Sequence, residues 1–428
     1  MKIFKIMLPG IALLAIGTVW ANNDVKVAEQ HNNEESLDDT NHVLYESCIN
    51  LNIGAACNSL GYSYSEGQGV KQDYSKANVY YEKACNLNVG EGCFNLGNSY
   101  KFGRSVKQDY PKANTYYEKA CSLNVGAGCV NLGVSYEHGK GVIQDYKKAN
   151  TYYEKACNQN IKEGCNNLGI LYVKGNGVKQ NYQQAKTYYE KACNLNNGGG
   201  CRNLGNSYYN GEGVKQDYQK ANTYYEKACE LNNDVGCYNL GNSYKDGRGV
   251  KQDYTKAKFY YEKACNMNYG EGCYNLGILY VKGLGLRQDD SKANIYYEKA
   301  CNLNKGRGCF NLGNSYANGR SVKQDYSKAK FYYEKACNLD NGGGCLNLGG
   351  LYRKGLGLRQ DFSMAVSCYK KGCNLKNNIA CNNLGILYED GVGVRQNKSK
   401  AKEYFGKSCD LGSQEGCDNY RNLNEQGY

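Results

Sequence analysis

Cysteine is the residue whose type and spacing could do chemistry throughout this chain. The sequence holds 23 cysteines, and ten of them recur every 36 residues, from Cys85 to Cys409. Each is followed eight residues later by a second cysteine, and a pair spaced by nine opens the series. Cysteines in such an array could form disulfides or bind metal ions. The pairs are Cys48 and Cys57, Cys85 and Cys93, Cys121 and Cys129, Cys157 and Cys165, Cys193 and Cys201, Cys229 and Cys237, Cys265 and Cys273, Cys301 and Cys309, Cys337 and Cys345, Cys373 and Cys381, and Cys409 and Cys417.

The start of the chain favours disulfides. Residues 1–21 combine Lys2 and Lys5 with an apolar run and end in a small-x-small pattern at Ala21, which predicts a secretory signal peptide cleaved after Ala21. A retained membrane anchor is the competing interpretation, but the run is short for a span and contains Pro9. We therefore expect no membrane span in the mature chain. Export to the periplasm or outside the cell allows thiols to pair.

Metal binding fits the spacing less well. Seven residues separate the paired cysteines, whereas zinc sites use about two to four. The sequence has three histidines, His31, His42 and His138. We expect no metal and no cofactor. Since partners close in sequence pair without chain rearrangement, each pair is predicted to close on itself.

The elements that position the cysteines are helices. Before Cys85, residues Ala77 and Tyr81 fall at helical spacing, and after Cys93 so do Leu96 and Tyr100. An Asn/Gly-rich turn joins the two patterns, so each period is an αα-hairpin with one disulfide. Asp73 is the expected N-cap of the first helix, and Gly103 the expected end of the second.

The repeat predicts an all-α solenoid of αα-hairpins. Residues 22–43 are expected to be a disordered acidic leader, and residues 44–428 a single solenoid of about ten full 36-residue repeats with a C-terminal cap. Its first helix, from Leu44 to Cys48, is expected to be truncated. Gly97 and its equivalents lie within the second helices, where close helix contact would offset the cost of glycine.

The repeated motif resembles the Sel1-like repeat, a relative of the tetratricopeptide repeat, and this resemblance implies a superhelix of the tetratricopeptide type. It appears here as Leu60, Gly61, Tyr64, Gly67, Gly69, Val70, Asp73, Lys76, Ala77, Tyr81 and Ala84. With a signal peptide and one cysteine pair per repeat, the chain is similar to the secreted Helicobacter cysteine-rich proteins. The departures within the array are Asn181 and Asn397 in place of aspartate and Gln184 in place of lysine, which change caps and surface charge.

The resemblance implies two functions. Such repeats look like scaffolds for protein interactions, and members of the cysteine-rich family have been described as penicillin-binding proteins or β-lactamases. A serine β-lactamase needs SxxK together with SDN and KTG elements, and neither of the latter occurs. We favour a protein or peptide binding scaffold, and leave the enzyme and a purely structural envelope component as alternatives. The SxxK matches are Ser327 to Lys330, Ser367 to Lys370 and Ser399 to Lys402.

Three further features of the sequence bear on partners and packing. Cys368 is left without a partner, and it is either a small buried thiol or a reactive group that pairs between molecules. The net charge of +12 is spread evenly, so nucleic acid is not an expected partner. The Asn residue two positions after each second cysteine, as at Asn95 and Asn131, is expected to bridge neighbouring repeats from its side chain to the backbone.

The candidate binding face lies on the second helices. The positions one, five and eight residues after the second cysteine share a face and vary between repeats, so we expect them to line the concave surface of the solenoid. Neutral variation on an exposed face is the alternative. The oligomeric state stays open. The candidate binding residues are Phe94, Asn98, Lys101, Arg202, Tyr209, Tyr238, Lys245, Tyr274, Phe310 and Arg353.

Overall fold

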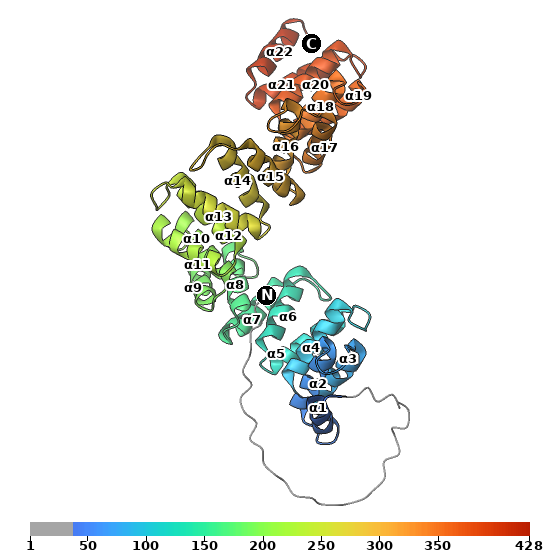
Figure 1. Cartoon of the computed structure of the whole chain (residues 1–428), viewed down its shortest axis with the longest axis vertical. Helices are drawn as coiled ribbons and strands as arrows, with labels where there is room; N and C mark the ends of the chain where they lie inside the picture. The colour runs from blue at the N-terminus through green and yellow to red at the C-terminus, as the bar shows by residue number, and fades with distance from the viewer. Residues whose placement is uncertain (1–36) are drawn as a thin grey trace, which may run out of the picture. The chain divides into compact units, whose positions relative to one another are not determined.

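The computed structural model describes residues 37–428, which contain 22 α-helices and no strand (Figure 1). The predicted all-α hairpin architecture is confirmed for these residues. The predicted signal peptide and residues 22–36 of the leader lie outside them. The helices are α1 (Asp39–Ile49), α2 (Gly54–Glu66), α3 (Tyr74–Asn86), α4 (Gly90–Phe102), α5 (Tyr110–Ser122), α6 (Gly126–His138), α7 (Tyr146–Asn158), α8 (Lys162–Lys174), α9 (Tyr182–Asn194), α10 (Gly198–Asn210), α11 (Tyr218–Glu230), α12 (Asp234–Asp246), α13 (Tyr254–Asn266), α14 (Gly270–Lys282), α15 (Asp290–Asn302), α16 (Gly306–Asn318), α17 (Tyr326–Asn338), α18 (Gly342–Lys354), α19 (Phe362–Asn374), α20 (Asn378–Asp390), α21 (Lys398–Asp410) and α22 (Gln414–Glu425).

The chain forms two compact units, one ending at Gly92 and the other beginning at Cys93. The odd-numbered helices are the first helices of the hairpins and the even-numbered helices the second. Whether residues 44–428 act as a single solenoid stays a prediction, because each unit is described by itself.

The first helix begins earlier in the sequence than expected. Helix α1 starts at Asp39, so residues 39–43, which we assigned to the leader, are helical, and the first helix is not truncated at Leu44. The cause is a local cap: the Asp38 side chain accepts from the Asn41 backbone N–H at 2.8 Å. Asn41 Nδ2 in turn donates to the Gln68 carbonyl at 2.8 Å, which fixes α1 to the loop after α2.

The helix ends follow the predicted signals. Asp73 accepts hydrogen bonds from the backbone of Ser75 and Lys76, and Asn181 and Asn397 cap their helices in the same way. Gly103 has a φ of +71°, the left-handed conformation that stops a second helix. The departures from aspartate therefore preserve the cap.

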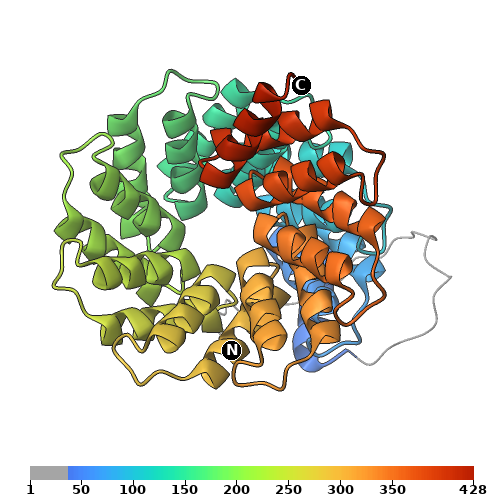
Figure 2. The same cartoon turned by 90° about the horizontal axis from the view of Figure 1, so that it is seen from above.

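In the second unit, each first helix packs between the second helices on either side of it, as α9 does between α8 and α10. Second helices of successive hairpins also touch, for example α10 with α12 and α16 with α18. Figure 2 shows the successive hairpins of this unit side by side, with the longer connecting loops on their outer side. The stack is a helical solenoid whose second helices line one continuous face.

Tyrosine rings form much of the core in the second unit. Tyr153 and Tyr261 on the first helices are fully buried. A second set of rings stacks between hairpins, as Tyr244 does on Tyr260 with centroids 5.6 Å apart. The expected close contact at the mid-helix glycines is confirmed, because a Cβ on Gly241 would lie 2.7 Å from ring atoms of Tyr261.

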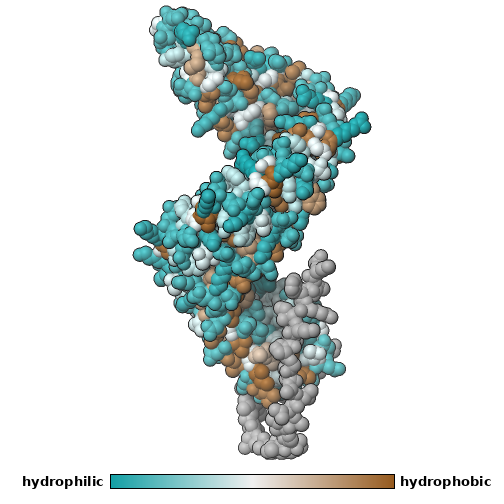
Figure 3. Space-filling view, turned by 90° about the vertical axis from the view of Figure 1, so that its left-hand side faces the viewer, coloured by the Kyte–Doolittle hydropathy of each residue, from teal (hydrophilic) through white to brown (hydrophobic). Residues whose placement is uncertain are grey.

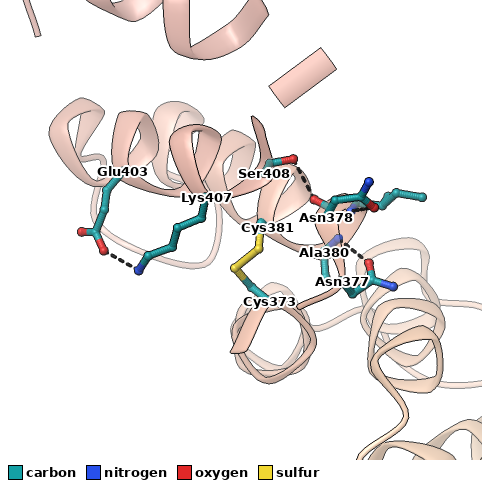
Figure 4. The surroundings of a disulfide bond; sticks show 9 residues. Cys373, Asn377, Asn378, Ala380, Cys381, Glu403, Lys407 and Ser408 are labelled. Atoms are coloured by element: carbon teal, nitrogen blue, oxygen red, sulfur yellow. Dashed lines mark hydrogen bonds and ion pairs between the residues drawn. A yellow bond between two sulfur atoms is a disulfide. The ribbon is translucent and has the colours of Figure 1, made fainter. Parts of the chain in front are cut away.

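In one hairpin, a glycine and an alanine that pack on each other have exchanged places between the two helices. In the other hairpins of the second unit up to α17–α18, an alanine on the first helix faces a glycine on the second, as Ala264 faces Gly272. In α19 and α20 the glycine is Gly372 and the alanine is Ala380, beside the Cys373–Cys381 bridge that Figure 4 shows. A Cβ on Gly372 would lie 2.8 Å from the Cβ of Ala380, so only one of the two positions can carry a methyl group.

This exchange predicts a compensating double variant. Gly372→Ala is expected to lower the free energy of unfolding by about 1–3 kcal/mol through overpacking. Ala380→Gly is expected to lower it by about 1 kcal/mol, because glycine is unfavourable within a helix. The double variant should return close to wild type, since it restores the pairing found in the other hairpins. Urea unfolding of all four proteins measures the coupling. Additive losses would contradict it.

Candidate functional site

The cysteine pairs close as predicted within the described residues. The bridges from Cys121–Cys129 to Cys409–Cys417 have Cα atoms 4.5 to 4.8 Å apart, and those of Cys48–Cys57 are 4.7 Å apart. Cys85 and Cys93 are disulfide-bonded as well. In this part of the chain, no group of three or more His, Cys, Asp or Glu side chains is placed to hold a metal ion. The bridges indicate an oxidising, extracytoplasmic compartment.

Cys368 is a free, buried thiol. It stands on α19 where other first helices carry a tyrosine, and it packs in a cluster with Tyr352, the ring on which that tyrosine would stack. Burial raises the pKa of the Cys368 thiol to about 11, and the nearby Glu334 carboxylate adds to the shift. A buried thiol with so high a pKa is a poor nucleophile at neutral pH, which favours the packing role over the reactive one.

The three SxxK segments lie within first helices. Ser327 Oγ donates to the Gly357 carbonyl at 3.4 Å, and the lysine of the same segment, Lys330, pairs with Glu334 at 3.5 Å. Lys402 donates to Asn424 Oδ1 at 2.7 Å, close to the C-terminus. Ser367 and Lys370 are exposed on α19. These contacts are those of ordinary helix surfaces, and no observation on the described residues supports β-lactam chemistry.

The ten candidate binding residues lie on the second helices, where we expected a surface, and each of them is half-buried. The reason is packing against the next hairpin. The residues that directly follow the second cysteine lean on a core tyrosine there: Phe94 on Tyr117 with centroids 6.0 Å apart, and Phe310 on Tyr333 at 6.2 Å. We call the residues at this position in α4 to α18 the inner row: Phe94, Val130, Asn166, Arg202, Tyr238, Tyr274, Phe310 and Leu346.

The position five residues after the second cysteine has a structural task. Asn242 Oδ1 accepts from the Tyr261 hydroxyl at 2.6 Å and from Asn275 Nδ2 at 3.4 Å, which joins three helices of two hairpins. Asn98 makes the same bonds with Tyr117 and Asn131. The expected bridge between repeats is therefore present, but its acceptor is a side chain and not the backbone.

The position eight residues after the second cysteine has local partners. Lys245 pairs with Asp246 at 3.2 Å, and the Tyr209 ring meets the Tyr218 ring edge-on at 5.1 Å. Burial lowers the pKa of Lys101, and the charge of Lys140 adds to the effect. Arg353 is half-buried on α18, and its positive charge opposes the burial that raises the pKa of Tyr369.

A cluster of aromatic and charged residues forms around the inner row on α10, α12 and α14. Within residues 37–428, the Nε atom of Arg202 is buried and has no hydrogen-bond partner. Burial raises the pKa of Tyr269, the nearby groups of Tyr238, Glu271 and Asp234 add to the shift, and the charge of Arg202 opposes it. The rings of Tyr238 and Tyr269 lie 5.1 Å apart, and the Lys305 ammonium lies 5.8 Å from the centroid of Tyr269. We call Arg202, Tyr238, Tyr269, Tyr274 and Lys305 the Arg202 cluster.

Sequence reasoning missed two members of this cluster. Tyr269 and Lys305 immediately precede α14 and α16, and their position lies in the turn between the two helices of a hairpin. Lys305 also pairs with Glu271 at 3.4 Å, which links two hairpins. The sequence does contain a signal for these two residues, because the residue type at their position varies between repeats as it does in the inner row. The residues at this position are Val125, Ile161, Asn197, Asn233, Tyr269, Lys305 and Asn341.

Comparison with known proteins identifies the repeat. The family model described as Sel1 repeat matches residues 54–89, 90–125, 126–161, 162–197, 199–233, 235–269, 270–305, 306–341, 343–377 and 378–413. The chain belongs to the Sel1-repeat family. No curated protein sequence matches it significantly.

Solved structures agree with this assignment. A protective antigen of uropathogenic Escherichia coli that displays an SLR fold is 27% identical, with a TM-score of 0.63, over 90% of this chain and 82% of that one. A Sel1 repeat protein from Oxalobacter formigenes is 30% identical, with a TM-score of 0.53, over 57% and 99%. Helicobacter pylori cysteine rich protein B is 41% identical, with a TM-score of 0.27, over 32% and 97%.

Proposed function

We propose that this protein is a secreted, disulfide-stapled scaffold that binds a protein or peptide ligand along the inner row. Stacked repeats create extended surfaces of this kind, and the variable positions gather on one of them. The observation that carries the proposal is the Arg202 cluster, since it combines aromatic side chains with a cation that lacks a counter-ion in the described chain. The predicted cleavage after Ala21 is part of the proposal.

The unpaired arginine indicates the chemistry of the ligand. Burial raises the pKa values of Tyr189 and Tyr225 above their usual range, and the charge of Arg202 opposes both shifts, so the guanidinium acts on the phenols of two neighbouring hairpins. Within residues 37–428 no carboxylate forms an ion pair with it. A ligand carboxylate could supply the missing acceptor, with two parallel hydrogen bonds to the guanidinium.

The aromatic residues supply anchors beside this cation. Tyr238 contacts Tyr261 and Tyr269, and Tyr274 contacts Tyr297 with centroids 6.0 Å apart, so their rings are held by the hairpins beneath them. Rings ordered in this way lose little entropy when a ligand covers them. Tyrosine and arginine are also the residues that most often dominate binding energy at interfaces. The expected ligand is therefore an acidic peptide segment that contains aromatic or aliphatic side chains.

Selection from a random peptide library displayed on phage tests the proposal with the oxidised mature protein as bait. We expect enrichment of peptides rich in Asp or Glu next to apolar residues. The variant Arg202→Asn/Tyr238→Asn/Tyr274→Asn should bind a selected peptide at least about tenfold more weakly. Asparagine is chosen because Asn166 occupies this position on α8, so the variant should keep its helical content.

Val130→Asn on α6 is the matched control, since it makes the same kind of change at the same position outside the cluster. It should leave peptide affinity unchanged. If no peptide is enriched, or if the control variant loses as much affinity as the triple variant, the Arg202 cluster is not the binding site.

A further inference from the structure

A second unusual surface lies on the first helices of the second unit, away from the inner row. The position six residues before the first cysteine reads Thr115, Thr151, Thr187, Thr223, Phe259, Ile295, Phe331, Ser367 and Glu403. Phe259, Ile295 and Phe331 are 59%, 62% and 58% exposed. They occupy the same site on three successive hairpins, on α13, α15 and α17. We call these three residues the outer row.

The threonines show what the position requires for folding. Thr115 Oγ1 donates to the Pro111 carbonyl at 3.2 Å, and Thr223 Oγ1 donates to the Gln219 carbonyl at 3.2 Å. Each threonine therefore bonds within its own helix and is otherwise exposed to water. A polar residue therefore serves the fold at this site. The fold does not require a large apolar side chain here, because threonine occupies the same position in other hairpins. Exposed apolar side chains in three consecutive hairpins therefore indicate an interaction surface.

Tyrosine rings extend the apolar surface between these residues. The Phe259 ring meets the Tyr260 ring edge-on at 5.1 Å, and Phe331 meets Tyr332 in the same way. The Tyr332 hydroxyl donates to Glu298 Oε1 of the preceding hairpin at 3.2 Å. The outer row is thus backed by half-buried rings that link one hairpin to the next. Figure 3 shows that the visible face of the molecule is mostly hydrophilic, with hydrophobic residues in scattered patches.

Lysines flank every member of the outer row at the same two helical positions. Lysine stands three residues before and four residues after each apolar side chain, on the same helix face. Lys256 and Lys328 extend over tyrosine rings, with Nζ 5.1 Å from the centroids of Tyr244 and Tyr316. The flanking residues are Lys256 and Lys263 around Phe259, Lys292 and Lys299 around Ile295, and Lys328 and Lys335 around Phe331.

We propose that the outer row is a peripheral docking surface for an anionic membrane. Exposed aromatic and aliphatic side chains flanked by lysines are the composition of segments that insert shallowly at a lipid interface. There the lysines neutralise phosphate headgroups. No helix in residues 37–428 combines the length and apolar character needed to cross a bilayer, so such contact would be peripheral.

Two other occupants fit the charges less well. A second copy of this face would bring lysines against lysines, which costs energy. A protein interface usually excludes lysine from its centre, whereas here each apolar residue has lysines on both sides. On its helix face each outer-row residue has two lysines and one glutamate, which is Glu262, Glu298 or Glu334. The balance is positive, which favours a surface that offers both acyl chains and phosphates.

Vesicle flotation with the oxidised mature protein tests this inference. Wild type should float with phosphatidylcholine vesicles that contain phosphatidylglycerol and remain unbound with phosphatidylcholine alone, and added salt should weaken the binding. Phe259→Thr/Ile295→Thr/Phe331→Thr should lower the partition coefficient at least about tenfold. This variant copies the residue of the preceding repeats, and circular dichroism verifies its fold.

Thr187→Phe/Thr223→Phe provides the reverse test, because it extends the outer row to two more hairpins and should raise vesicle binding about tenfold. The inference is overturned if wild type ignores anionic vesicles, or if neither variant changes the partition. A wild-type dimer that the threonine variant abolishes, without any vesicle binding, would instead assign the row to a second copy. An acidic protein that competes for the row while vesicles do not bind would likewise overturn it.

Discussion

Reduction of the disulfides is expected to unfold this protein. On the chain-entropy account, each bridge closes a loop of about nine residues and contributes about 2.5 kcal/mol. The core between the bridges consists largely of alanine, glycine and tyrosine, with few large aliphatic side chains. Whole domains are stable by only about 5–15 kcal/mol, so losing the contributions of many bridges exceeds the margin.

A graded experiment separates one bridge from all of them. Cys265→Ala/Cys273→Ala should lower the free energy of unfolding by about 2.5 kcal/mol, because both sulfurs are buried and alanine leaves no polar group behind. Full reduction by a phosphine should abolish the helical signal in circular dichroism at a temperature where the oxidised protein stays folded. A reduced protein that still unfolds cooperatively in urea would show that helix packing suffices without the bridges.

The sequence was most informative where a physical constraint recurs in every repeat. The pairing of cysteines, the caps at Asp73 and its equivalents, and the close approach at Gly97 all repeat with the 36-residue period and are all present. Each depends on contacts within a hairpin or between neighbours, so a single repeat contains the necessary information.

The structure differs from the sequence-based expectations where the contacting residue is remote in the sequence. The early start of α1 involves the Asp38 cap and the bond from Asn41 to the Gln68 carbonyl, which lies 27 residues further along the chain. Later repeats make the same long-range bond, for example from Asn114 to the Lys140 carbonyl. The half-burial of the candidate binding residues follows from how the next hairpin leans on them, for instance Tyr297 on Tyr274. Variation between repeats therefore selected side chains that are only partly exposed, and their role in binding stays a prediction.

Two adjacent glycines on α18 give a final test of how closely the hairpins pack. Gly349 occupies the repeated mid-helix position, and a Cβ there would lie 2.6 Å from Cε1 of the buried Tyr369 ring. Gly350 is its neighbour in the candidate binding face, and a Cβ there would meet nothing within 4 Å. Neither has a left-handed backbone, so alanine is conformationally allowed at both.

The two alanine substitutions are therefore expected to change stability in opposite directions. Gly349→Ala should lower the free energy of unfolding by about 1–3 kcal/mol, because the Tyr369 ring is held in the core and cannot move aside cheaply. Gly350→Ala should raise it by up to about 1 kcal/mol, since alanine favours the helix and loses less entropy on folding. Urea unfolding of the oxidised proteins gives both values. If Gly349→Ala were neutral or stabilising, the ring would not be in contact with the helix backbone, and glycine at this position would need another explanation.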